Sequence, residues 1–121
     1  MPGHADCINS GGTHDWRATQ NDNLWQGVNG INNPCPSGYR IPTGPELLAE
    51  RSSGGAFLAS PLKWSQSGIR SDGGSIYNAI RSYVWSSEVS SSFAKSSYNT
   101  SATLSNSKRQ YSMSVRCIKH Y

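Results

Sequence analysis

The stretch that most constrains the fold is Asn33–Thr43, with the sequence NPCPSGYRIPT. Its three prolines fix the backbone φ angle and its glycine permits a tight turn, so this segment must follow one irregular path. Thr43 can then cap a helix, with Glu46 completing a capping box and Pro45 in the tolerated first turn. The sequence therefore predicts a rigid loop and a helix that ends at Ser52–Gly55.

Short strands are predicted after the helix, where apolar and polar residues alternate. These segments are Leu62–Ser65, Ile76–Tyr77, Tyr83–Ser87 and Met113–Ile118. Ser71–Gly74, with the sequence SDGG, reads as a turn. One clear helix among several short strands predicts an α+β fold that is rich in loops.

The length of 121 residues fits one domain. Only 35% of the chain is hydrophobic, but four Trp, six Tyr and two Phe can supply much of a small core. Residues 1–15 are rich in Gly, His, Asn and Ser and are expected to form a flexible N-terminal segment, with the domain at residues 16–121. No apolar run suits a signal peptide or a membrane span, so we expect no direct membrane insertion. The start at Met1-Pro2-Gly3 suggests the C-terminal part of a longer protein.

The net charge of +4 and the pI of about 9.2 raise the question of nucleic-acid binding. The bases after Val89 are not accompanied by any acid, and they are Lys95, Lys108, Arg109, Arg116 and Lys119. They are scattered among Ser and Tyr rather than packed as a basic block. This spacing indicates a solvated face, and we expect no nucleic-acid partner.

The three cysteines are Cys7, Cys35 and Cys117. A Cys35–Cys117 bond would close a loop of about 80 residues and stabilise the fold by up to ~4–5 kcal/mol. The alternative is two buried thiols in a reducing compartment. The chain has no CxxC motif, and its three His lie near the ends at no metal-ligand spacing. We therefore expect no metal and no cofactor.

The last third of the chain has a composition of its own. Between Tyr83–Ser87 and Ser114–Lys119 the residues are mostly Ser, interspersed with Tyr, Phe, Asn, Lys and Arg. Tyr offers rigid amphipathic contact area, while Ser and Asn offer adaptable hydrogen bonds, as in antibody paratopes. A flexible Ser-rich linker is the alternative, but a linker has few aromatics and does not end in an alternating strand. The composition predicts a binding surface.

Four segments together carry a family resemblance: Asn33–Thr43, Ser60–Lys63, Trp85–Ser87 and Ser114–Lys119. In this order they resemble the ligand-binding domain of variable proteins diversified by diversity-generating retroelements. The same framework is similar to the Fibrobacter succinogenes major paralogous domain. The resemblance covers roughly residues 16–121 and implies a C-type lectin-like fold, with two helices and a twisted, partly looped antiparallel sheet.

In that family an error-prone reverse transcriptase rewrites adenine-bearing codons near the 3′ end of the gene, while framework codons stay unchanged. The resemblance thus implies a hypervariable ligand-binding face between the framework segments. Carried onto this sequence, its positions are Tyr77, Asn78, Arg81, Ser82, Tyr83, Phe93, Lys95, Tyr98, Ser105, Ser107, Lys108, Tyr111 and Ser112. Among these, Tyr77 and Tyr111 have polar sequence neighbours, which favours contact over burial. Trp85 is expected in the core, and Arg40 and Arg116 in structural roles.

Three other functions compete with ligand binding by a variable face. A calcium-dependent lectin needs several carboxylates, whereas the chain has seven acids and only Glu88 after Asp72. An enzyme related to the formylglycine-generating enzymes needs reactive cysteines in a cleft, and no Ser-His-Asp set can be drawn here. A structural tail, pilus or adhesin module of the same fold, binding a surface glycan without calcium, remains the alternative.

We therefore expect a non-enzymatic receptor-recognition domain on a virion tail or at a bacterial cell surface, in the extracellular space. Its ligand would be a protein or a surface glycan on a host or neighbouring cell. Whether the chain forms a homo-oligomer is left open by the sequence.

Overall fold

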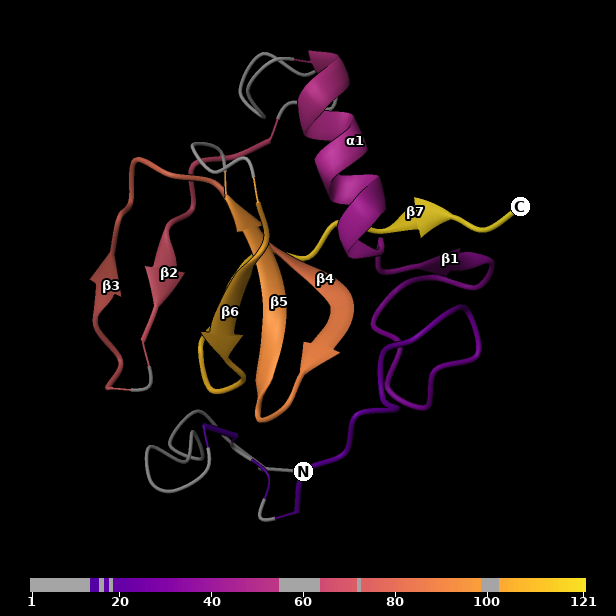
Figure 1. Ribbon diagram of the computed structural model, residues 1–121, viewed down its shortest axis with the longest axis horizontal. Coiled ribbons are helices and arrows are strands. Elements are labelled where there is room, and N and C mark those ends of the chain that lie inside the picture. The colour runs from indigo at the N-terminus through magenta and orange to yellow at the C-terminus, as the bar shows by residue number, and fades with distance from the viewer. Residues whose placement is uncertain (1–13, 16, 18, 55–63, 72, 99–102) are drawn as a thin grey trace.

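The computed structural model describes residues 14, 15, 17, 19–54, 64–71, 73–98 and 103–121 (Figure 1). Within these residues the chain forms one helix and seven short strands. In chain order they are β1 (Tyr39–Arg40), α1 (Gly44–Gly54), β2 (Ile69–Arg70), β3 (Ile76–Tyr77), β4 (Tyr83–Ser90), β5 (Phe93–Tyr98), β6 (Ser105–Lys108) and β7 (Ile118–Lys119). All paired strands are antiparallel, so the described residues confirm an α+β fold that consists mostly of sheet.

The central sheet has the strand order β4–β5–β6. Tyr83 pairs with Tyr98 at one end of the β4–β5 ladder, and a register shift lies between Trp85 and Val89. Helix α1 packs against β4 and β5. There Val84 forms the centre of the hydrophobic core with Leu47 and Trp64, all three nearly inaccessible to solvent.

A three-residue segment, Ser112–Ser114, joins this sheet to the β2–β3 hairpin. Ser112 exchanges two backbone hydrogen bonds with Arg70 of β2, both of 3.0 Å. Ser114 accepts a hydrogen bond from the Trp85 N–H at 3.1 Å and donates one to the Tyr83 carbonyl at 3.2 Å. Backbone hydrogen bonds therefore connect the hairpin to β4, and the hairpin is part of the framework rather than an independent loop.

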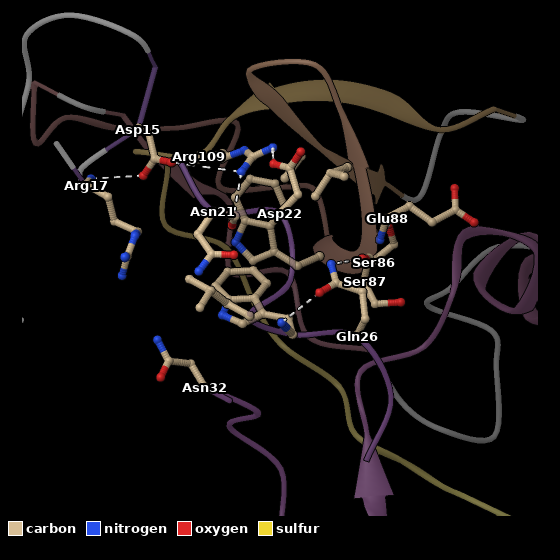
Figure 2. A pocket seen from close by; sticks show the side chains of 15 residues that line it. Asp15, Arg17, Asn21, Asp22, Gln26, Asn32, Ser86, Ser87, Glu88 and Arg109 are labelled. Carbon is tan, nitrogen blue, oxygen red and sulfur yellow. Dashed lines mark hydrogen bonds and ion pairs between the residues drawn. The ribbon is translucent and has the colours of Figure 1, made fainter. Parts of the chain in front are cut away.

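Arg109, in the turn after β6, attaches the N-terminal part of the chain to the sheet (Figure 2). One of its terminal nitrogens, Nη2, donates to Asp22 Oδ1 at 2.6 Å and to the Ser91 carbonyl at 2.9 Å. Nη1 lies 3.9 Å from Asp15 Oδ2, and both of these side chains are at most 10% exposed. The hydrogen bond from Arg109 is the main cause that holds the pKa of Asp22 below its ordinary value.

The boundary of the folded part lies earlier than residue 16. The ring of His14 stacks on Phe93 with 5.0 Å between centroids, and its carbonyl accepts a hydrogen bond from the Gln110 N–H. Asp15 is buried beside Arg109. The flexible segment expected at residues 1–15 therefore includes two residues that pack on the domain, and residues 1–13 lie outside the described residues.

The predicted start of the helix is confirmed by its hydrogen bonds. Glu46 Oε2 accepts the Thr43 N–H at 2.7 Å, as a capping box requires, and the Leu47 N–H donates to the Thr43 carbonyl. Arg40 donates to both carboxylate oxygens of Glu46, at 2.6 and 2.8 Å, in its predicted structural role. The Gly44 N–H donates to Glu88 Oε1 at 3.2 Å, which places a second carboxylate at the positive end of the helix.

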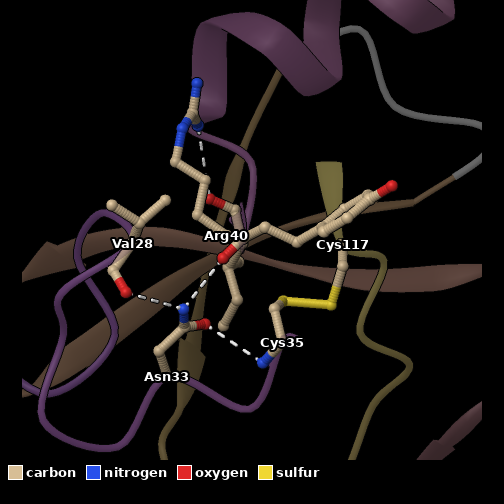
Figure 3. Close-up of a disulfide and its surroundings, with 7 residues drawn as sticks. Val28, Asn33, Cys35, Arg40 and Cys117 are labelled. Atoms are coloured by element: carbon tan, nitrogen blue, oxygen red, sulfur yellow. Dashed lines mark hydrogen bonds between the residues drawn. A yellow bond between two sulfur atoms is a disulfide. The ribbon is translucent and has the colours of Figure 1, made fainter. Parts of the chain in front are cut away.

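Cys35 and Cys117, whose pairing the sequence left open, form a disulfide with 5.7 Å between their Cα atoms (Figure 3). Asn33 shapes the loop beside it, since its side chain accepts the Cys35 N–H at 3.1 Å and donates to the Tyr39 carbonyl at 2.9 Å. Close by, Tyr39 of β1 pairs with Lys119 of β7. The two framework segments at Asn33–Thr43 and Ser114–Lys119 are thus joined side by side.

Two predicted strands are wrong. Trp64 and Ser65 are not in a strand, because the Trp64 ring turns into the core, with the Arg116 guanidinium 5.4 Å from its centroid; Leu62 and Lys63 lie outside the described residues. The strand expected at Met113–Ile118 is interrupted, because the chain leaves β4 at Ser114 and pairs again only in β7. The second helix implied by the resemblance is not found in the described part of the chain. No described helix has both the length and the apolar character needed to cross a bilayer.

Candidate functional site

The structure connects seven of the residues predicted at the binding face, and we call this group the tyrosine face. Its members are Tyr77, Asn78, Arg81, Tyr98, Lys108, Tyr111 and Ser112, and every one of them is exposed or half-buried. They come from β3, the segment before β4, the end of β5, the end of β6 and the segment after β6. Residues far apart in the sequence therefore meet here.

One half of the tyrosine face is built on Tyr77 and Tyr111. Their rings meet edge to face, with 6.5 Å between centroids and an interplanar angle of 86°. Lys108 Nζ lies 5.8 Å from the centroid of the Tyr111 ring, within cation–π range. Tyr77 belongs to β3, which pairs with β2, and Tyr111 precedes Ser112, which pairs with Arg70. Hydrogen-bonded backbone therefore positions both tyrosines.

The other half is built on Tyr98. The Arg81 guanidinium lies 5.5 Å from the centroid of its ring, and the buried Tyr83 ring lies 5.3 Å away on the neighbouring strand. The two halves meet through Asn78, which follows Tyr77 in the chain and donates from its side chain to the Tyr83 hydroxyl at 3.0 Å. Asn78 has a φ of 51°, a left-handed conformation that Asn tolerates better than most residues.

Two residues predicted at the binding face are inside the molecule. Ser82 is 1% exposed and Tyr83 is 8% exposed. The Tyr83 ring lies against the Tyr98 ring and its hydroxyl accepts the hydrogen bond from Asn78, so Tyr83 is covered by members of the tyrosine face. Because both side chains are buried, neither is in a position to contact a ligand.

Two further residues predicted at the binding face, Phe93 and Lys95, have partners outside the tyrosine face. Lys95 lies 4.0 Å from Glu88 near the start of α1, and Phe93 stacks on His14.

The predicted positions on β6 have structural partners as well. Ser107 and Ser96 join their hydroxyls in a hydrogen bond of 2.8 Å across the β5–β6 ladder. Ser105 pairs with Ser96 in the register and is half-buried. Both β6 serines thus belong mainly to the sheet.

Sequence reasoning missed a groove beside Ser112. It has a volume of ≈ 250 Å³ and is lined by Ser67, Gly68, Arg70, Ile76, Ser112, Met113 and Ser114. Its two sides are far apart in the sequence and meet only because Ser112 pairs with Arg70. No local pattern could have predicted it. Of the residues that line the groove, only Ser112 was among the positions that the family resemblance implied.

A second hollow, of ≈ 60 Å³, lies on the side of the sheet that carries Trp85 (Figure 2). Trp25 and Trp85 meet there edge to face with 6.3 Å between centroids. Five charged residues line it: Asp15, Arg17, Asp22, Glu88 and Arg109. Arg109 forms ion pairs with Asp15 and Asp22, and Glu88 lies 4.0 Å from Lys95. We therefore regard this hollow as part of the contact between the chain before β1 and the central sheet.

The side chains of the tyrosine face have the chemistry of a contact surface. Its titratable side chains are tyrosines, a lysine and an arginine. Among the described residues no three His, Cys, Asp or Glu come together in a way that could hold a metal ion. What the face offers is flat aromatic area, hydroxyl and amide hydrogen-bonding groups and positive charge.

No protein-family model, curated protein or solved structure matches this chain, so its function must be argued from the geometry described above.

Proposed function

We propose that the protein is a non-enzymatic ligand-binding domain whose tyrosine face contacts a protein or a surface glycan on a host or neighbouring cell. The observation that carries the proposal is the connected set of Tyr77, Tyr98 and Tyr111, with cations over two of the rings, held on hydrogen-bonded backbone. Rigid aromatic side chains lose little entropy on binding and suit both apolar and polar partners.

We further propose that the fold is C-type lectin-like and that a diversity-generating retroelement varies this face. Support comes from the four framework segments, two of which are joined by the Cys35–Cys117 disulfide and the β1–β7 pair. A scaffold fixed in this way tolerates changes at exposed positions without unfolding. The disulfide also supports display on a virion tail or a cell surface, since such bonds persist in oxidising environments.

A pair of tyrosines with matched exposure tests the binding function. Tyr77 is 40% exposed in β3 and Tyr39 is 39% exposed in β1, and Figure 1 shows the two strands at opposite sides of the molecule. We expect Tyr77→Ala to weaken binding of the purified domain to its host cells at least tenfold, and Tyr39→Ala to leave it within twofold. Binding is measured by flow cytometry with labelled protein. Equal effects of the two variants would refute the assignment of the face.

The retroelement origin is tested at the gene itself. A near-identical template repeat should lie close to the gene, beside a reverse transcriptase, with mismatches at template adenines. The mismatches should fall in codons for positions of the tyrosine face such as Tyr77 and Tyr111, and not in the codon for buried Trp85. A locus without the repeat, or with mismatches spread over all bases, overturns this part of the proposal.

A further inference from the structure

The groove beside the tyrosine face has the composition of a site for a small polar ligand. Hydroxyl groups come from Ser67, Ser112 and Ser114, a guanidinium from Arg70, and apolar contact area from Ile76 and Met113. A few well-placed polar groups beside apolar walls are typical of small-molecule sites, although the volume of ≈ 250 Å³ is small for a drug-sized ligand. The space suits one sugar residue better than a peptide segment.

The floor of the groove is rigid. Arg70 and Ser112 are tied by two backbone hydrogen bonds, and the Gly68 N–H donates to the Arg81 carbonyl at 3.0 Å. Gly68 has a φ of 66°, and a Cβ there would lie 2.9 Å from the Tyr77 carbonyl oxygen, so only glycine fits. A ligand would therefore meet groups that are already in place, and little free energy would be lost in ordering them.

The hydroxyls at the rim have hydrogen-bonding capacity left. Ser67 Oγ and Ser114 Oγ lie 2.6 Å apart and share one hydrogen bond, in which only one of the two hydroxyl protons is used. The other hydroxyl proton can be donated to a ligand, and both oxygens can still accept. Ser112 is exposed at the same rim and adds a further hydroxyl.

The one charged residue among those that line the groove is Arg70. Arg70 is exposed and forms no ion pair with any described carboxylate. The described acids lie elsewhere: Asp15 and Asp22 at Arg109, Glu46 at Arg40, Glu88 at the start of α1, and Glu50 within α1. Asp72, between β2 and β3 in the sequence, lies outside the described residues. An exposed guanidinium favours a carboxylate, which it can bind through two parallel hydrogen bonds.

We propose that this groove binds a carboxylate-bearing sugar residue of a surface glycan. Arg70 holds the carboxylate, the hydroxyls of Ser67 and Ser112 bond to the ring hydroxyls, and Ile76 contacts the apolar side of the ring. The proposal rests on the binding function above and names the class of ligand. It also explains why the groove and the tyrosine face share Ser112, since a glycan that begins in the groove would continue over the neighbouring tyrosines.

The experiment uses trigalacturonate and its carboxyl-reduced counterpart, the corresponding neutral galactose trisaccharide, as probes. Each is titrated into the isotope-labelled protein while amide NMR signals are recorded. We expect trigalacturonate to shift the signals of residues 67–70 and 112–114, with an affinity at least tenfold above that of the neutral sugar. Arg70→Gln should weaken trigalacturonate binding at least tenfold, whereas Lys119→Gln, which removes one positive charge from exposed β7, should change it less than twofold.

Each result has a defined meaning. Equal affinity for the two sugars, or equal effects of the two variants, overturns the proposal. So does equally tight binding of trialanine, a peptide with a free terminal carboxylate, because the groove would then recognise only the anion. If trigalacturonate fails while Tyr77→Ala still abolishes cell binding, the inference is wrong and the proposed function stands. If trigalacturonate binds but Tyr77→Ala has no effect on cells, the groove is confirmed and the tyrosine face is not.

Discussion

The sheet and the β2–β3 hairpin differ in which side chains they hide from solvent. In the sheet, Ser86, Ser96 and Ser97 are at most 1% exposed, whereas Ile76 in the hairpin is 68% exposed and Ile80 just after it is 77% exposed. At these positions small polar residues lie inside and large apolar ones outside. The difference follows from what covers each region.

The serines are buried because other elements lie close over them. Ser97 is opposite Val84 in the β4–β5 register, on the side where Val84 meets Leu47 of α1, so a small side chain lets the helix approach. Ser86 Oγ donates to the Lys95 carbonyl at 2.9 Å, and Ser96 bonds to Ser107. The hydroxyls of Ser86 and Ser96 are thus satisfied by the ladder itself, which makes their burial tolerable.

The hairpin is held by backbone hydrogen bonds and by one buried side chain, that of Ile69 in β2. A two-stranded ribbon alone is marginally stable in water, and here the pair of bonds between Arg70 and Ser112 attaches it to the sheet. Ile76 in β3 is exposed and is therefore not needed for packing within the chain. Exposed apolar side chains in a rimmed patch are common at interaction sites, which agrees with the proposed function of this region.

The largest expected difference between the two regions is in core packing. Trp85 is 3% exposed and contacts Trp25, so Trp85→Ala should lower the free energy of unfolding by about 3–5 kcal/mol. Tyr77→Ala, in the hairpin, should lower it by less than about 1 kcal/mol. Urea unfolding monitored by circular dichroism measures both. A tyrosine variant as unstable as the tryptophan variant would abolish the distinction between framework and binding face.

A smaller effect should separate two neighbouring buried serines. Ser96→Ala removes the hydrogen bond to Ser107 and should destabilise the fold by about 1 kcal/mol. Ser97 Oγ is buried with no hydrogen-bond partner among the residues that the structure describes, so Ser97→Ala should be neutral or stabilise the protein by up to about 1 kcal/mol. The melting temperatures of the two variants, compared with that of the original protein, test both predictions. If Ser97→Ala is the more damaging change, the buried serines are not explained by their hydrogen bonds.

The smallest effect concerns the pH dependence of the framework. The hydrogen bonds from Arg40 are the main cause that lowers the pKa of Glu46 from 4.5 to about 2. Because the folded pKa is the lower one, the contribution of Glu46 is complete above about pH 4.5 and is lost as the pH falls toward 2. The Glu46 side chain is 39% exposed, so solvent screening limits this contribution to about 1 kcal/mol.

Glu46→Gln is the matched test of that dependence. Unfolding midpoints in urea at pH 7, 4.5 and 2.5 should fall with pH for the original protein and fall less for the variant. At pH 7 the variant should be about 1 kcal/mol less stable, and at the lowest pH the two should converge. Parallel curves would show that Glu46 does not contribute through its charge.

The helix could be predicted from the sequence because its signals are local. Thr43 and Glu46 form the start signal within three residues, and the glycines that end the helix are adjacent in the sequence. The structure places α1 at Gly44–Gly54. The strand at Met113–Ile118 could not be predicted correctly, since its partner changes from β4 to β1 within a few residues. Such a change of pairing partner depends on tertiary contacts and cannot be seen in the alternation of apolar and polar residues.

The candidate site was predictable in part for a similar reason. Composition and resemblance predict Tyr77 and Tyr111 on one surface, and the two rings do lie together. The burial of Ser82 could not be foreseen, because serine is common both on surfaces and in closely packed strands. The contact of Lys95 with Glu88 could not be foreseen either, because it depends on how β4 and β5 pair.

The pairing of β1 with β7 has a consequence for how the chain folds. Tyr39 meets Lys119, Cys35 meets Cys117, and Val84 meets Ser114, so the framework is closed by contacts with the last residues of the sequence. During synthesis these pairs cannot form until residues Ser114–Lys119 have left the ribosome. Contacts of such large sequence separation slow folding, because a long loop must close before the contacts can stabilise the fold. Residues Ser114–Lys119 therefore complete the framework at a late step of assembly, and a chain cut short before them would lack the pairs that close it.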